Sequence, residues 1–182
     1  MNLFHTLSRL ESNDDVHLAR LLILLGAFAG PDGVRSIEGL TKLAKLDFLL
    51  RYPVYLESAL RSKNASTRAV QVADHERTSV ESKMVRYRYG PWDFRYRRFI
   101  NILVAKGLAR VDTHGRRIEI SLTSTGLEIV NALSSNEAFH DLARRSKLLK
   151  QHFDQQGTTL MRFVYKTFPE IGTLRLGEGI RS

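Results

Sequence analysis

The stretch MVRYRYGPWDFRYRRFINILVAKGLARVDTHGRRIEISLTST, from Met84 to Thr125, decides most of the fold. The Gly-Pro pair within it predicts the start of a helix over residues 90–106, and Gly107 follows in the position where helices favour glycine. Residues 109–111 and 118–122 alternate apolar and polar side chains, which predicts two strands joined by a Thr-His-Gly turn. The stretch therefore predicts a helix followed by a β-hairpin.

The same stretch carries most of the positive charge of the chain. From Met84 to Arg117 there are nine basic and two acidic residues, a balance of +7 out of the formal +9 of all 182 residues. Positive charge concentrated in one stretch indicates an acidic partner, most often a phosphate backbone.

Helices are also expected on both sides of this stretch. Asn13, Asp14 or Asp15 can cap a helix that ends at Phe28, and Ser36 can cap another that ends before Pro53, with Pro53 opening a short helix of its own. The spacing of Leu3, Phe4, Leu7 and Leu10 predicts a short helical arm at the start of the chain.

Two regions depart from this helical pattern. Residues 61–83 lack apolar periodicity, which indicates a mobile, solvated insertion. After the helix that Thr123 or Thr125 caps, residues 134–182 predict a helical hairpin and a Gly-rich tail that needs a neighbour to hold it. We therefore expect a first domain over residues 1–133 and a C-terminal unit over 134–182.

Composition narrows the class of protein. An apolar fraction of 43% is ample for a packed core, and the absence of cysteine excludes disulfides and thiolate chemistry. The apolar segment LLILLGAFAG, residues 21–30, is too short to span a bilayer and lacks the basic start of a signal peptide. We expect a cytoplasmic, soluble protein without a membrane partner.

The order of LTKLAKL, KGLARV, GRR and LTSTG resembles a MarR-like winged helix-turn-helix. The predicted fold class is accordingly mainly α with a small β wing (α+β), a long inserted loop and a C-terminal helical hairpin. By this resemblance the helix before the wing enters the major groove, and basic residues of the wing reach the minor groove. The residues predicted to bind DNA are Arg86, Arg88, Arg95, Arg97, Arg98, Arg116 and Arg117.

Aromatic residues alternate with these arginines, and this leaves two alternatives open. Arginine with tyrosine and tryptophan is typical of protein interface hot spots as well as of nucleic-acid grooves. A third interpretation is a solvated basic face above a core that contains Trp92 and Tyr96. The residues predicted to bind a protein partner are Tyr87, Tyr89, Trp92, Phe94, Phe168, Ile171, Leu176 and Ile180.

A second resemblance covers nearly the whole chain. It rests on IEGLTKLAKLDFLLRYP, MVRYRYGPWDFRYR, KGLARV, LTSTG, YKTFPEI and LGEGI, of which the first two are the most distinctive. These blocks resemble the middle component of ABC-three-component systems, a family that includes the small subunit (LmuC) of the Lamassu anti-phage defence system.

This resemblance implies a non-enzymatic adaptor subunit that works with an SMC/Rad50-like ATPase and an effector, often a nuclease, and couples DNA sensing to effector release. Double-stranded DNA would be bound without sequence preference. The alternative is a free-standing MarR-like transcription regulator, which would use the C-terminal helical hairpin as a symmetric dimer surface. The six histidines show no metal-ligand spacing, and no Gly-rich phosphate loop is present, so we expect no catalytic residue, metal or cofactor.

Overall fold

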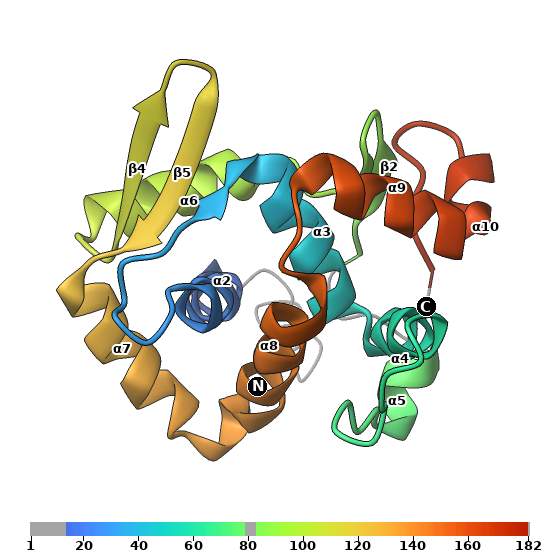
Figure 1. Cartoon of the computed structure of the whole chain (residues 1–182), viewed down its shortest axis with the longest axis horizontal. Helices are drawn as coiled ribbons and strands as arrows, with labels where there is room; N and C mark the ends of the chain where they lie inside the picture. Colours follow the sequence, from blue (N-terminus) through green and yellow to red (C-terminus); the bar gives the residue numbers. More distant parts are fainter. Residues whose placement is uncertain (1–13, 79–82, 182) are drawn as a thin grey trace, which may run out of the picture.

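The computed structural model describes residues 14–78 and 83–181 of the chain, and the predicted helical arm at Leu3–Leu10 lies outside these residues (Figure 1). The long helices are α2 (Asp14–Phe28), α3 (Gly39–Arg51), α4 (Pro53–Ser62), α6 (Tyr96–Ala105), α7 (Ser124–Ser134), α8 (His140–Phe153) and α9 (Gly157–Thr167). The short helices are α5 (Asp74–Thr78), η1 (Glu137–Phe139) and α10 (Pro169–Thr173). The strands are β1 (Ile37–Glu38), β2 (Val85–Tyr87), β3 (Gly90–Trp92), β4 (Ala109–His114) and β5 (Arg117–Leu122).

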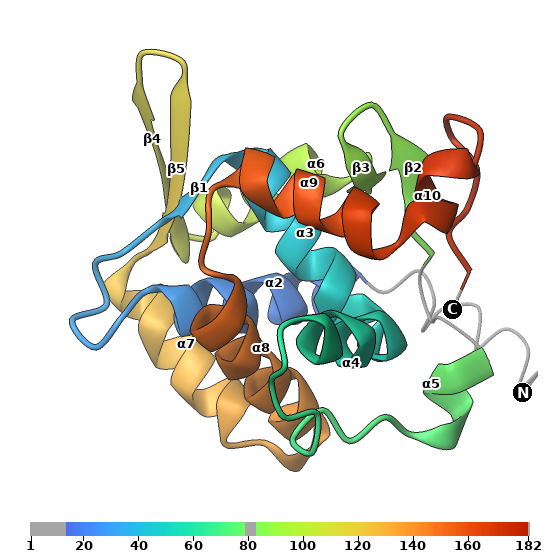
Figure 2. The same ribbon diagram turned by 45° about the vertical axis from the view of Figure 1, so that its right-hand side comes forward.

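Helix α3 forms the centre of the fold. Every residue from Lys42 to Leu50 is buried, charged side chains included. Helices α2, α4, α8 and α9 and strands β1, β3 and β5 all pack against it, as Figures 1 and 2 show. A helix that is covered on every side must bury its polar residues with partners, and this requirement shapes the site described below.

A helix ending at Phe28 was predicted from candidate N-cap residues and an apolar run, and α2 confirms it. Asp14 and Asp15 occupy its first turn, where carboxylates favour the positive end of the helix dipole. The segment from Leu21 to Leu25 is completely buried. Among the described residues, none of the helices combines the length and the apolar character needed to cross a bilayer.

The larger sheet has the strand order β1-β5-β4, and all its pairs are antiparallel. The β4–β5 hairpin was predicted, although its strands extend further, to His114 and from Arg117. Strand β1 was not, because Ser36 was expected to cap a helix there. Instead Ile37 pairs with Ile120, and the helix starts at Gly39, whose φ of 79° turns the chain. The α+β class is confirmed as a mainly helical fold with a small antiparallel sheet.

A second, two-stranded sheet corrects the predicted start of α6. Gly90 and Pro91 were expected to open the helix, but they form strand β3, which pairs with β2. Gly90 has a φ of 98°, which a β-hairpin turn accepts and a helix start does not. The helix begins only at Tyr96 and ends, as predicted, before Gly107. Gly107 has a φ of 70°, in the left-handed region that glycine adopts without strain.

The C-terminal helices belong to the main core and do not form a unit of their own. Thr123 caps α7 by accepting a hydrogen bond from the Gly126 amide at 3.0 Å, as predicted. Helix α8 packs on α2 and α3, and α9 packs on α3 and α4. Leu149, Phe153 and Val164 therefore share one hydrophobic cluster with α2 and α3, across the boundary expected at residue 134.

The insertion between α3 and α6 was predicted to be solvated and mobile. Most side chains of residues 61–78 are exposed, but Val70 is fully buried. Arg145 of α8 donates to the carbonyl oxygens of Val70 and Gln71, both at 2.9 Å, and pairs with Glu76 at 2.7 Å. Residues 70–76 of the insertion are thus attached to α8, which corrects the expectation of a solvated segment for this part of it.

The Gly-rich tail finds its neighbour within the same chain. The amide of Arg86 donates to the Glu178 carbonyl, and the amide of Ile180 donates to the Met84 carbonyl, each at 2.8 Å. The Tyr52 hydroxyl accepts from the Met84 amide at 2.8 Å and donates to the Ile180 carbonyl at 3.1 Å. The tail therefore lies beside β2, as Figure 2 shows for the segment after α10.

Candidate interaction surfaces

A buried ionic network begins at Asp47, at the middle of α3. The Asp47 carboxylate is fully buried and accepts hydrogen bonds from Arg20 Nε at 2.7 Å, Arg51 Nε at 2.9 Å and the Tyr96 hydroxyl at 2.7 Å. Burial by itself would raise the pKa of Asp47, but the guanidinium groups of Arg20 and Arg51 outweigh it and hold the pKa below its ordinary value. The network joins α2, α3 and α6 at one ionised carboxylate.

Asp93 extends this network to the loop between β3 and α6. Arg51 Nη2 donates to Asp93 Oδ2 at 2.8 Å, and Arg95 Nε and Nη2 donate to the same carboxylate at 3.0 and 2.8 Å. Burial would raise the pKa of Asp93, but the hydrogen bonds from Arg95 and the charge of Arg51 hold it well below its ordinary value. Arg95 also approaches His17 Nε2 at 3.3 Å. The network therefore ties the β2–β3 hairpin to the helices beneath it.

Lys45 supports the hairpin from below. Its side chain is fully buried, its Nζ donates to the Pro91 carbonyl at 3.2 Å, and burial lowers its pKa to about 7. A Cβ at Gly90 would lie 3.2 Å from Lys45 Cε, so the lysine leaves little room for any other residue there. No signal in the sequence identified this contact, because the two residues belong to separate elements.

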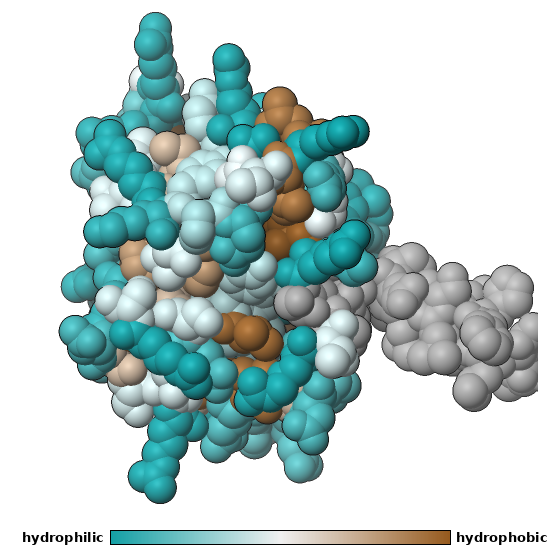
Figure 3. Space-filling model, turned by 90° about the vertical axis from the view of Figure 1, so that its right-hand side faces the viewer, coloured by the Kyte–Doolittle hydropathy of each residue, from teal (hydrophilic) through white to brown (hydrophobic). Residues whose placement is uncertain are grey.

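The β2–β3 hairpin carries an aromatic cluster on its outer side, which we call the hairpin patch and define as Tyr87, Trp92 and Phe94. The ring centroids of Tyr87 and Phe94 are 5.3 Å apart, and those of Tyr87 and Trp92 are 6.0 Å apart. Tyr87 is 40% exposed and Phe94 is 65% exposed. Leu176, in the tail beside β2, is also 65% exposed. Figure 3 views the side that carries α10 and the tail, where patches of apolar surface are bordered by hydrophilic residues.

Three residues predicted to bind a partner are not on the surface. Phe168, Ile171 and Ile180 are buried, at 3%, 0% and 1% exposure. Phe168 packs edge-on against Tyr55, and Ile180 lies under the strand pairing of the tail with β2. The prediction is wrong for these three residues, because the end of α9, α10 and the tail have neighbours in their own chain that take these side chains into the core cluster.

The arginines predicted to bind DNA fall into two groups. Arg86 donates to the Leu174 carbonyl at 2.8 Å, Arg95 belongs to the buried network, and Arg98 pairs with Asp14. The second group is exposed and forms no ion pair with another described residue: Arg88, Arg97, Arg116 and Arg117. The free cations thus lie on the β2–β3 turn, on α6 and at the tip of the β4–β5 hairpin.

The two faces of the larger sheet differ in chemistry. Glu38, Glu119 and Asp112 are neighbours across the three strands, so their carboxylates form a row on one face. Val111 and Ile118 lie on the other face and are 39% and 38% exposed. The positive charge of this hairpin lies at its tip, on Arg116 and Arg117, and at its base, on the exposed Arg110, with the carboxylate row between them.

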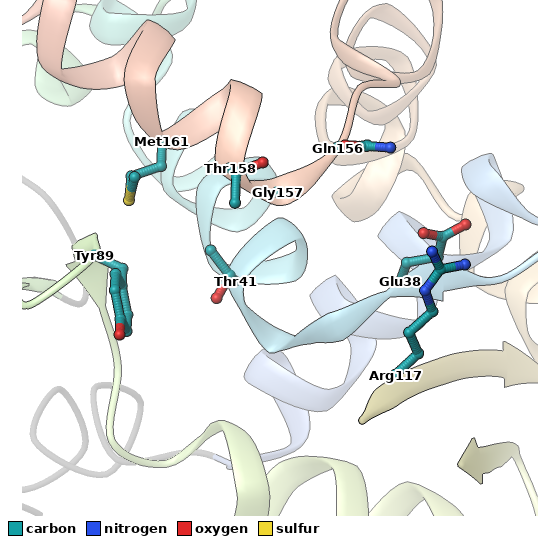
Figure 4. A pocket seen from close by; sticks show the side chains of 8 residues that line it. All are labelled: Glu38, Thr41, Tyr89, Arg117, Gln156, Gly157, Thr158 and Met161. Carbon is teal, nitrogen blue, oxygen red and sulfur yellow. The ribbon is translucent and has the colours of Figure 1, made fainter. Parts of the chain in front are cut away.

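A groove of about 510 Å³ lies between the two hairpins and the first turns of α3 and α9 (Figure 4). The residues that line it are Glu38, Thr41, Tyr89, Arg117, Gln156, Gly157, Thr158 and Met161. Tyr89, predicted to bind a protein partner, faces this groove and is 50% exposed. Except for Arg117, no signal in the sequence identified the other lining residues, since they come from three separate elements, β1, α3 and α9.

Comparison with protein-family models, with curated proteins and with solved structures gave no match for this chain. Within residues 14–78 and 83–181, no group of three or more histidine, aspartate or glutamate side chains is placed to hold a metal ion.

Proposed function

We propose that α2, β1, α3, α6, β4 and β5 form a winged helix-turn-helix in which the segment from α4 to β3 is inserted between the two helices of the motif. The strand order β1-β5-β4, with α6 directly before the β4–β5 hairpin, supports this assignment. In this arrangement α6 is the recognition helix and the β4–β5 hairpin is the wing.

We further propose that the chain is a non-enzymatic adaptor subunit of an SMC/Rad50-like ATPase complex of the Lamassu type, acting in anti-phage defence with an effector such as a nuclease. The observation that carries this proposal is the hairpin patch. Exposed aromatic side chains beside free arginines have the composition of interface hot spots. The two sequence blocks that are most distinctive of the middle-component family correspond to α3 and to this hairpin.

Rigidity of the patch supports a docking role. Asp93 follows β3 directly and is held by Arg51 and Arg95, while Lys45 supports the hairpin at Pro91. A surface that is already ordered before binding loses less conformational entropy when a partner docks on it. The hairpin therefore presents its aromatic rings in a fixed arrangement.

The arrangement of the C-terminal helices favours an adaptor over a free-standing dimeric regulator. A regulator was expected to dimerise through α8 and α9, but both helices pack on the central core. No large apolar residue of α8 or α9 is among the exposed ones in the described chain. Their outward positions are polar, for example Lys147 and Arg162.

DNA contact in this proposal is directed at the backbone and is weak for the isolated subunit. The cations of this motif without an ion pair among the described residues are few: Arg97 and Lys106 on and after α6, and Arg110, Arg116 and Arg117 on the wing. The carboxylate row of Glu38, Glu119 and Asp112 lies across the same sheet. Each phosphate contact contributes about 0.9 to the log-log salt slope for a duplex. We therefore expect similar affinities for unrelated duplexes.

The adaptor proposal is tested by co-purification of the tagged full-length chain with the ATPase from the native host. Tyr87→Ala combined with Phe94→Ala should lower retention of the ATPase by about 30-fold or more, the effect of losing a hot spot of at least about 2 kcal/mol. Ile129→Ala, which removes an exposed apolar side chain on α7, is the matched control and should retain it. The proposal is wrong if the wild-type chain returns only itself, as a homodimer on its own promoter.

A further inference from the structure

The groove between the two hairpins has a distinct chemistry at each end. In Figure 4, Tyr89 and Met161 stand on one side, and Arg117 and Glu38 stand on the other. The hydroxyl groups of Thr41 and Thr158 lie between them. Its volume of about 510 Å³ is within the range of roughly 300–1,000 Å³ that is typical of ligand sites.

The apolar end offers a flat surface of the kind that an aromatic ring needs. The Tyr89 ring is half exposed, and the flexible, polarisable thioether of Met161 faces the same space. Every nucleobase has a π-face, so a ring of this kind accepts any base by stacking. This end of the groove therefore suits an unpaired base.

The remaining lining groups are polar, and their side chains are not paired with one another or with other described residues. Thr41, Gln156 and Thr158 form no side-chain hydrogen bond with another described residue. Arg117 makes no ion pair within the described chain, and the Glu38 carboxylate, an acceptor, lines the same groove. Hydroxyl, amide and carboxylate groups can bond to the donors and acceptors of a base or ribose, while Arg117 can bond to a phosphate.

The backbone adds further donors at the middle of the groove. Helices α3 and α9 both start here, and neither N-cap residue, Glu38 or Gln156, caps its helix with its side chain. The first amides of two helices therefore remain available for acceptor atoms. A Cβ at Gly157 would lie 3.0 Å from the Lys42 amide nitrogen, so glycine keeps the two helix starts in close contact.

We propose that this groove binds a nucleotide with an unpaired base, stacked on Tyr89 beside Met161, with its sugar and phosphate toward Thr41, Thr158 and Arg117. The groove is open and lies beside the free cations of the wing tip, so its expected source is a single strand of nucleic acid, with a free mononucleotide as the other source. A base inside a duplex cannot reach Tyr89. The inference does not depend on the adaptor role, because Tyr89 faces the groove while the hairpin patch faces outward.

The test is fluorescence anisotropy of the full-length chain with a labelled ten-nucleotide single strand of mixed sequence, compared with the same sequence as a duplex. Tyr89→Leu should weaken single-strand binding roughly 5- to 150-fold, the loss expected for one stacked base, while Tyr89→Phe should bind like wild type. Arg117→Gln should reduce the log-log salt slope of single-strand binding by about 0.7. Lys147→Gln, an equal loss of charge on α8, is the control, and any loss of affinity that it causes should be equal for the single strand and the duplex.

Competition by adenosine and guanosine monophosphates separates the two sources of the nucleotide. Competition at millimolar concentration identifies a free mononucleotide as sufficient, and its absence identifies the strand. The inference is overturned if Tyr89→Leu binds the single strand as wild type does, if no nucleotide probe binds, or if only an acidic peptide does. Tyr89→Leu should still co-purify with the ATPase, so failure of the nucleotide site can be distinguished from failure of the adaptor proposal.

Discussion

Replacing Asp47 by asparagine is the sharpest test of how the interaction surfaces are held in place. The substitution keeps the shape of the side chain but removes its negative charge, while Arg20, Arg51 and Tyr96 still direct four donor groups at it, two of them from Arg20. Asparagine retains one acceptor oxygen and presents an NH₂ group, so at least one donor loses its partner. The fully buried position prevents water from replacing it.

The magnitude follows from the charges in the network. Arg20, Arg51 and Arg95 against Asp47 and Asp93 give three minus two, or +1, and Asp47→Asn changes this to three minus one, or +2. Removing one partner from a buried ion pair costs about 3–5 kcal/mol. The total free energy of unfolding of a typical domain is about 5–15 kcal/mol, so the variant should lose a large share of its stability.

Asp154→Asn is the matched control. Asp154 accepts from Lys42 at 2.7 Å and from Lys150 at 2.5 Å, but its side chain is 37% exposed, and such pairs contribute about 0–1 kcal/mol. Urea unfolding followed by circular dichroism measures both variants, and an unchanged m-value shows that the midpoint shift reports stability. If Asp47→Asn and Asp154→Asn differ by less than about 1 kcal/mol, the buried network does not hold the hairpin and our account of it is wrong.

Two further predictions concern the core. Burial, with the charge of Arg20, lowers the pKa of His17 to about 4, so between about pH 6.5 and 4 the unfolded chain binds a proton that the folded chain does not. The free energy of unfolding should therefore fall by up to about 3 kcal/mol as the pH drops through this window. His17→Gln, measured by urea unfolding at each pH, should remove this part of the dependence of stability on pH. An unchanged dependence would contradict the assignment to His17. Ile180→Ala should lower the free energy of unfolding by about 2–5 kcal/mol, because Ile180 is 1% exposed. Leu176→Ala in the same tail is the control and should change it by less than about 0.5 kcal/mol, because Leu176 is 65% exposed. Equal effects of the two variants in thermal or urea unfolding would show that the tail is not anchored in the core.

Local signals predicted the elements whose boundaries depend on neighbouring residues. The acidic first turn of α2, proline at the start of α4, glycine after α6 and the Thr123 cap of α7 were all found where the sequence indicated them. Each of these signals satisfies or terminates backbone groups within a few residues, so the information is contained in the local sequence. The β4–β5 hairpin belongs to the same group, because its strands are joined by a short turn.

Long-range pairing produced the elements that were missed. Residues 37–38 become a strand only because β5, some eighty residues later, offers edge groups to Ile37. Gly90 and Pro91 become a strand because β2 pairs with them and Lys45 supports them from α3. The tail joins the core because Ile180 meets Met84 and Tyr52. The spacing of residues along the chain does not identify such distant partners.

The sequence by itself determined the charge and aromatic content of residues 84–117, and hence that this region would form the chemically distinctive surface of the protein. Only the tertiary structure decided which of these side chains are free. Arg95 is held by Asp93, whereas Arg117 remains exposed, and Phe94 reaches solvent, whereas Tyr96 is buried. The physical reason is that availability depends on the partner that another element brings within about 3 Å of a hydrogen-bonding group, or within van der Waals contact of a ring.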